Sequence, residues 1–261
     1  MKEINKSTGA DFDAEGFFAW NPVFTTDALA QAVGGRRAAA RAAEISKYYR
    51  GTGRLKLITL GVHAAVPPGL DADRFSPDPY LVPAALRADA ILSHHAALDL
   101  NGAGHSLFFR YTYFTAQPRR RLSVGGYEWV ALAHPVPLVR AGKVDFGVRN
   151  QDRQGVRLRV TSPERTLVDG MAAPGWAGGL EELVESAAGF RHLDLDLVHA
   201  YLVLLDRRIL FAAVGWFLER YPEVADDSGS FLAKLETRIP NTPVYLDRRR
   251  GPGRVQSRWN L

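Results

Sequence analysis

Basic side chains are concentrated in one short segment of the chain, residues 34–66. That segment holds seven lysines or arginines against a single acid, Glu44, whereas residues 1–33 hold two bases and five acids. Guanidinium and ammonium groups donate hydrogen bonds to phosphates and, from within a groove, to the edges of bases. The segment therefore predicts contact with a nucleic acid.

Arg37 and Arg41 are the pair best spaced to read bases. They lie four residues apart in an expected helix over 36–49, so both occupy one face, and Tyr48 falls on the same stripe. The other cations are expected to hold the phosphate backbone. The alternative is an ordinary solvated face. The predicted DNA-binding residues are Arg36, Arg37, Arg41, Lys47, Tyr48, Arg50, Arg54 and Lys56.

Three short helices and a hairpin are expected to position these side chains. Apolar spacing and cap residues predict helices over 13–20, from Thr25 or Thr26 to Val33, and over 36–49. Arg54 and Lys56 alternate with leucines up to Gly61, which predicts two strands joined by a turn. Helix-turn-helix followed by a two-stranded wing indicates a winged helix-turn-helix domain at 1–67.

A turn-rich linker over 67–77 separates this domain from a larger one at 77–261. Strand patterns are expected at 107–115, 122–132, 143–148 and 156–160. Helices are expected at 78–87, 94–100, from Ser162 or Pro163 onward, and at 178–189, 196–206, 208–220 and 230–238. The fold class expected is α+β, with a central antiparallel-rich sheet and C-terminal helices in the larger domain.

Composition excludes several classes of protein. The chain contains no cysteine, so disulfides and thiolate metal sites are ruled out. No stretch approaches the roughly 20 apolar residues of a membrane helix, and the polar start is unlike a signal peptide. These features predict a cytoplasmic protein that does not bind membranes.

Two pairs of residues suggest catalysis, and both have a simpler explanation. Adjacent positions such as His94 and His95 point about 100° apart on a helix, so packing or capping is favoured over metal binding. Asp194 and Asp196 resemble the paired aspartates of nucleotidyl transfer, downstream of Gly178-Gly179, but they open a helix and are expected to cap it. No catalytic residue, metal or cofactor is predicted. The alternative is a nuclease or nucleotidyltransferase carried by the C-terminal domain.

Two further basic clusters lie outside the N-terminal segment. One is the run 119–121, and the other comprises Arg248, Arg249, Arg250, Arg254 and Arg258. The C-terminal cluster either contacts DNA or RNA or is solvated. A third interpretation is that the chain is a protein-interaction module whose basic patches bind an acidic partner or RNA.

Several segments together resemble the AbiEi family of type IV antitoxins, which are regulators in a viral defence system. The matching segments, spread over nearly the whole chain, are 78–82, 93–98 with Gly102, 161–169, 178–182 and 259–261. The chain departs from the family at Gly61-Val-His63, where a tyrosine commonly follows Gly-Val.

The resemblance implies an N-terminal winged helix that represses its own operon by binding inverted repeats in double-stranded DNA. It also implies a C-terminal domain that counters a neighbouring nucleotidyltransferase toxin without forming a stable complex. The family's recognition helix and wing match Arg36, Arg37, Arg41, Lys47, Arg54 and Lys56. The 93–95 and 162–165 segments, which are family hallmarks, are expected to be helix starts that set the fold.

Overall fold

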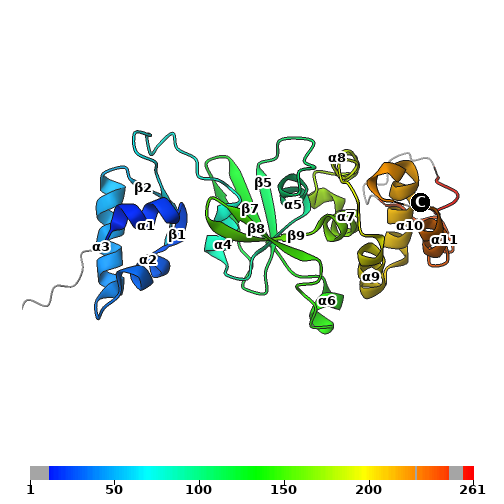
Figure 1. Cartoon of the computed structure of the whole chain (residues 1–261), viewed down its shortest axis with the longest axis horizontal. Coiled ribbons are helices and arrows are strands. Elements are labelled where there is room, and N and C mark those ends of the chain that lie inside the picture. Colours follow the sequence, from blue (N-terminus) through cyan, green and yellow to red (C-terminus); the bar gives the residue numbers. More distant parts are fainter. Residues whose placement is uncertain (1–11, 227, 247–254) are drawn as a thin grey trace, which may run out of the picture. The chain divides into compact units, whose positions relative to one another are not determined.

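A computed structural model describes residues 12–226, 228–246 and 255–261. The described residues form a mixed α+β protein with eleven α-helices and sheets of three and six strands (Figure 1). Two compact units divide the chain: one runs to Leu86 and includes 152–156, and the other comprises 87–151 and 157 onward. The sequence placed the boundary at 67–77, so residues 78–86 and 152–156 are additions to the first unit.

The N-terminal unit contains four helices, α1 (Ala14–Trp20), α2 (Thr26–Val33), α3 (Ala38–Gly51) and α4 (Leu81–Leu86). Side-chain caps explain where the first two begin. Asp13 accepts a hydrogen bond from the Gly16 amide, and Thr25 accepts one from the Ala28 amide. The first two predicted helices are therefore confirmed to within a residue.

A three-stranded antiparallel sheet completes this unit. Its strands are β1 (Val23–Thr25), β2 (Leu55–Thr59) and β3 (Val62–Ala65), in the order β1-β3-β2. The sequence predicted the β2–β3 hairpin but not β1, because three residues between Pro22 and a helix cap are too short for a periodic pattern. Pairing with β3 thus supplied what local sequence could not.

Aromatic side chains form the core of the N-terminal unit. Phe18 and Phe24 are buried and stacked, and Tyr49 of α3 meets Phe18 edge-on at 4.9 Å between ring centroids. Leu29 of α2 and Leu55 of β2 complete this core. The aromatic residues of α1 therefore fix α3 against the sheet.

The larger unit is built on a six-stranded sheet in the order β6-β7-β5-β4-β9-β8. The strands are β4 (Ile91–Ser93), β5 (Arg110–Phe114), β6 (Arg121–Val124), β7 (Tyr127–Leu132), β8 (Val148–Arg153) and β9 (Val156–Thr161). The β6–β7 and β4–β5 pairs are antiparallel, but β5–β7 and β4–β9 are parallel. The expected antiparallel-rich sheet is therefore a mixed one.

Seven helices accompany this sheet, most of them after β9 (Figure 1). They are α5 (His94–Leu100), α6 (Val136–Arg140), α7 (Pro163–Ala172), α8 (Leu180–Ala187), α9 (Leu195–Leu205), α10 (Arg208–Arg220) and α11 (Ser228–Glu236). Ser162 caps α7 with Pro163 at its first position, which is one of the two starts that the sequence allowed. The central helix α7 contacts α5, α8, α9 and α10.

Four sequence predictions beyond residue 77 are wrong. The strand expected over 122–132 is a hairpin of two strands, β6 and β7, with its turn at Gly125-Gly126. No strand forms over 143–148; α6 precedes this segment and β8 begins at its end. The helix expected from residue 78 starts at Leu81, because the Asp78 carboxylate first turns back to the Tyr80 amide. The buried strand β4 was missed, since three apolar residues carry no periodic signal.

Among the described residues, no helix has the length and apolar character to cross a membrane.

Candidate nucleic-acid interface

One face of α3 is built for close packing. Ala42 and Ser46, one turn apart, are buried, and Ala38, Ile45 and Tyr49 beside them are half-buried. This face packs against α2. Small residues let two helices approach closely, so the packed face stays narrow and the rest of α3 faces outward.

Six predicted contact residues lie outside the packed face, and all six are exposed: Arg36, Arg37, Arg41, Lys47, Tyr48 and Arg50. The helix starts two residues later than predicted. Gly34 and Gly35 have φ angles of +63° and +83°, which L side chains rarely adopt, and Arg37 is the N-cap. Arg36 and Arg37 therefore lie just before the N-terminus of the helix and not on its first turn.

Four of these cations have no acidic partner in the described part of the chain. Arg36, Arg37, Arg41 and Lys47 make no ion pair or side-chain hydrogen bond there, and their nearest acid in sequence is Glu44. Arg50 donates from Nε to the Ser46 carbonyl at 3.2 Å. Unpaired cations on a helix and just before its start are available to an anionic partner.

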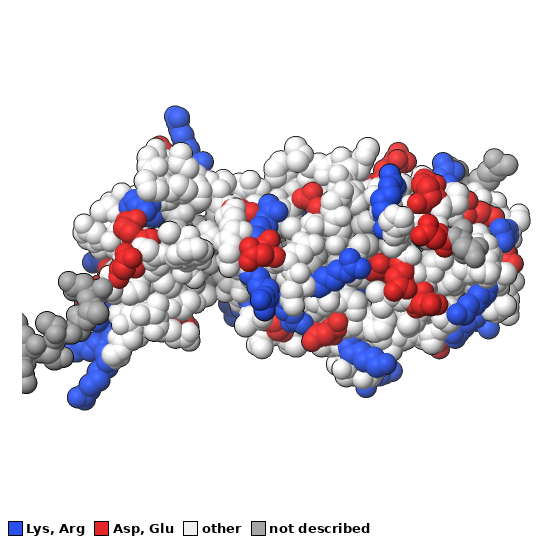
Figure 2. All heavy atoms as spheres, in the orientation of Figure 1, with Lys and Arg blue, Asp and Glu red and all other residues white. Residues whose placement is uncertain are grey.

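Basic side chains project from the surface over the end where α2 and α3 meet, in the face shown by Figure 2. On the face of the larger unit drawn there, basic and acidic side chains are interspersed. A cationic surface attracts a polyanion only where acids do not cancel it. The N-terminal unit therefore carries the better candidate surface.

Arg54 and Lys56 do not join this set of free cations. Arg54 forms an ion pair with Glu15 of α1. Lys56 donates from Nζ to the backbone carbonyls of Asp73 and Phe75, at 3.1 and 2.6 Å. Both side chains hold the N-terminal unit together, so the structure separates them from the predicted phosphate contacts.

The β2–β3 turn differs from the regular hairpin that the sequence predicted. A bulge at Ile58 shifts the register between Leu57 and Thr59; Ile58 is buried there, and Leu57 is 43% exposed. Leu60 at the tip is 96% exposed, beside Gly61 at φ +75°. Sequence reasoning missed Leu60; an apolar residue directly before a turn glycine was the available signal.

His63 is not a residue of this turn. It lies buried in β3, its Nε2 is 3.0 Å from the Thr26 hydroxyl, and its ring is 5.7 Å from that of Phe24. Burial, together with the charge of Arg50, lowers the pKa of His63. His63 therefore belongs to the core of the unit and not to the turn.

The other basic clusters give weaker candidates. Arg121 pairs with Glu128 at 2.9 Å, and Arg258 pairs with Glu219 and Glu236. Arg248, Arg249, Arg250 and Arg254 lie outside the described residues. Arg121 and Arg258 are therefore already engaged by carboxylates, whereas Arg119 and Arg120 are exposed and form no ion pair with a described residue.

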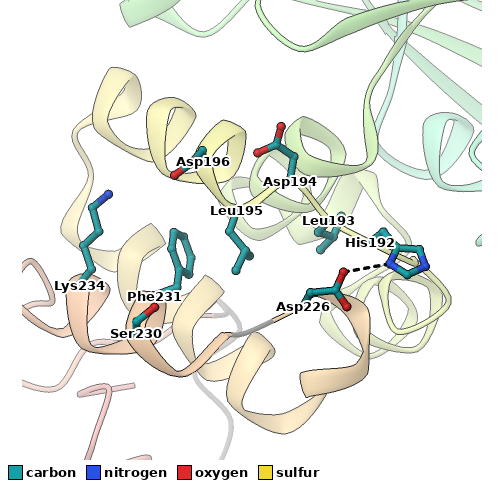
Figure 3. Close-up of a pocket in the computed structure, with 9 residues that line it drawn as sticks. All are labelled: His192, Leu193, Asp194, Leu195, Asp196, Asp226, Ser230, Phe231 and Lys234. Atoms are coloured by element: carbon teal, nitrogen blue, oxygen red, sulfur yellow. Dashed lines mark hydrogen bonds and ion pairs between the residues drawn. The ribbon is translucent and has the colours of Figure 1, made fainter.

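Asp194 and Asp196, the suspected catalytic pair, line one cavity at the start of α9 (Figure 3). The Asp194 carboxylate accepts from the Leu197 amide at 2.9 Å and so caps α9, as predicted. This cavity of about 460 Å³ also holds Asp226 and Lys234. Nowhere in the described ranges do three potential metal ligands gather. The geometry supports a helix cap.

His94 and His95 are both buried and held apart, as the packing interpretation predicted. Nδ1 of His94 is 3.0 Å from the Ser93 hydroxyl, whereas Nε2 of His95 is 3.1 Å from Glu182 and its ring stacks on Phe108. Burial alone would raise the pKa of Glu182, but hydrogen bonds, chiefly from Ser106 and His95, bring it below its usual value.

Comparison with known proteins supports the fold. No protein-family model matches the chain, and no curated protein matches it. Among solved structures, it is similar to the Rv2827c protein from Mycobacterium tuberculosis, with a TM-score of 0.60 and 19% sequence identity over 95% of this chain and 88% of that one. The likeness extends through both units and concerns their architecture.

Proposed function

We propose that the chain is a DNA-binding transcriptional regulator whose N-terminal unit is a winged helix. The observation that carries this proposal is a set of exposed, unpaired cations in and just before α3, outside the helix face that packs against α2: Arg36, Arg37, Arg41 and Lys47. In this proposal, α1, α2, α3 and the β1-β3-β2 sheet are the elements of the winged helix, and the β2–β3 hairpin is its wing.

The dimensions of α3 suit the major groove of double-stranded DNA. Its 14 residues extend about 21 Å, and a groove about 12 Å wide admits one helix. Arg37 and Arg41 are the proposed base readers, because a guanidinium can bond both acceptors of a guanine. Arg36, Lys47 and Arg50 are the proposed phosphate contacts, and Tyr48 shares the helix face of Arg37 and Arg41.

We further propose that the larger unit is the antitoxin part of a type IV toxin–antitoxin system. The support is the set of segments that resemble the AbiEi family, which lie in both units and follow one another in the family's order. In this proposal the protein represses its own promoter at inverted repeats and opposes a neighbouring nucleotidyltransferase toxin without a stable complex. It acts in this role as a regulator and not as an enzyme.

A gel shift on the DNA upstream of the protein's own gene tests the first proposal. Arg37→Ala or Arg41→Ala should weaken binding by about 1–3 kcal/mol, roughly 5- to 150-fold, and relax base preference. Arg140→Ala, an exposed arginine at the end of α6, is the matched control and should bind like the wild type.

The repressor proposal is wrong if the affinity for DNA does not depend on sequence or salt, or if Arg37→Ala, Arg41→Ala and Arg140→Ala all bind DNA equally well.

The antitoxin proposal has its own test. Co-expression of this protein with the product of the adjacent gene should rescue growth. Rescue by a variant that no longer binds DNA would separate the two activities.

A further inference from the structure

The larger unit contains a cavity that the proposed DNA contact does not use. It has a volume of about 360 Å³, within the range of small-molecule sites. Phe114 and Leu132, the paired last residues of the parallel strands β5 and β7, form one wall. The end of α7, the loop before α6 and the α9–α10 junction form the others.

The lining is largely apolar and includes one broad aromatic surface. Trp176, which follows α7, is half-buried, and the Arg110 guanidinium lies 5.8 Å from its ring centroid. Phe114 and the prolines at 135 and 137 add flat apolar surface. Such a lining favours a planar ring over a flexible chain.

His94 supplies a polar group to this apolar space. It is 97% buried, lines the cavity and has a φ of +50°, which costs a non-glycine residue energy. Nδ1 is held by Ser93, whose side chain makes no cap bond to α5. Nε2 has no hydrogen-bond partner in the described chain, so it is free for a ligand.

Positive charge lies at the junction of α9 and α10. Arg207 lines the cavity, is exposed and makes no ion pair with any described residue. It is also the N-cap of the 13-residue helix α10, whose first turn has no side-chain cap. The neighbouring Asp206 is occupied by Arg238 at 2.8 Å.

The acid of the cavity is already compensated. Asp169 accepts hydrogen bonds from Arg165 at 3.2 Å and from the Tyr201 hydroxyl at 2.6 Å. Its charge is therefore balanced within the protein, which leaves Arg207 and the α10 N-terminus as the uncompensated charge.

We propose that this cavity binds a small molecule with a planar aromatic ring and a short anionic group. The ring lies against Trp176 and Phe114 and bonds Nε2 of His94, and the anion contacts Arg207 at the start of α10. Nucleoside monophosphates and aromatic carboxylates both have this chemistry, and the site is independent of the DNA-binding face.

Isothermal titration of the full chain with adenosine 5′-monophosphate, indole-3-acetate, adenosine and inorganic phosphate tests the site. At least one of the two anionic aromatic probes should bind with a Kd below about 1 mM. That probe should also quench tryptophan fluorescence. Adenosine should bind more weakly than its monophosphate, and phosphate should not bind in this range. The tighter of the two anionic probes identifies the source of the ligand.

Variants distinguish this cavity from a surface site. Arg207→Ala should weaken the bound anionic probe at least tenfold, whereas Arg140→Ala should not change its affinity. Trp176→Leu should weaken it and remove the quenching. Thermal unfolding of each variant identifies any that are misfolded. If Trp176→Leu does not fold, Arg207→Ala still tests the site, because Arg207 is exposed and its replacement should not disturb the fold. Failure of both anionic probes to bind, or equal affinity in Arg207→Ala, overturns the proposal.

Discussion

At the scale of single residues, the larger unit depends on one buried guanidinium. Arg165 is fully buried, bonds Asp169, and donates from Nη1 to the carbonyls of Val144 and Phe146 at 2.8 and 2.7 Å. Its Nη2 has no partner among the described residues. Phe114 lies under the same group at 5.3 Å. Arg165 therefore ties α7 to the segment before β8, whereas the sequence identified residues 162–165 only as a helix start.

Replacement of Arg165 by methionine should destabilise the protein by about 3–5 kcal/mol, because Asp169 would remain buried without its partner. Urea unfolding followed by circular dichroism measures this loss. The control is Arg121→Met, whose pair with Glu128 is largely exposed and worth about 0–1 kcal/mol. Equal losses in the two variants would contradict the assigned role of Arg165.

His94 should make stability depend on pH. Its pKa is lowered to about 4: burial is the main cause, the charge of Asp169 opposes the shift, and the charge of Arg165 adds to it. Between pH 6.5 and 4 the unfolded chain therefore binds a proton that the folded chain does not. As the pH is lowered from 6.5 to 4, the free energy of unfolding should therefore decrease, and His94 should contribute up to about 3 kcal/mol of this decrease.

Burial also lowers the pKa of His63 and His134, which adds loss in the same direction. The contribution of His94 is therefore read as a difference: the unfolding free energy of His94→Asn should decline less between pH 6.5 and 4 than that of the wild type. Asparagine tolerates the positive φ at this position. Parallel curves would contradict the shifted pKa.

At the scale of elements, caps and small residues decide where helices begin and how closely they pack. Asp194 sets the start of α9, Ser162 that of α7, and Thr25 that of α2. The buried Ala42 lets α3 approach α2. These choices are local, so the sequence predicted them well.

Asp194→Ala should cost about 0.5–2 kcal/mol of stability, and Asp194→Asn should restore most of it, because asparagine caps as well as aspartate. Asp196→Asn, which removes no cap bond, is the control. Thermal unfolding measures all three. A catalytic pair would behave differently: both asparagine variants would lose an activity while keeping wild-type stability.

At the scale of the whole molecule, two units carry two chemical surfaces. The N-terminal unit presents unpaired cations, and the larger unit encloses an apolar cavity around buried polar groups. The fold shared with Rv2827c covers both units. The DNA-binding proposal therefore rests on one unit, and the small-molecule proposal on the other.

The salt dependence of DNA binding should distinguish free cations from structural ones in the intact protein. Lys47→Ala should reduce the slope of log K against log salt by about 0.9, because one fewer counterion is released. Lys56→Ala should leave that slope unchanged, since its Nζ bonds two backbone carbonyls. Gel shifts at several salt concentrations measure both slopes. Loss of slope in Lys56→Ala alone would reverse the assignment.

The sequence by itself determined the α+β class, most helix starts, the β2–β3 hairpin and the exposure of six residues in and around α3. Caps, turn glycines and helical periodicity act over a few residues, so they can be read locally. Tertiary structure alone decided the short strands β1 and β4, the parallel pairs of the large sheet and the internal bonds of Arg54 and Lys56. Each of these depends on a partner distant in the chain. A strand of three residues exists only because another strand pairs with it, and a cation is free only where the fold brings no acceptor to it.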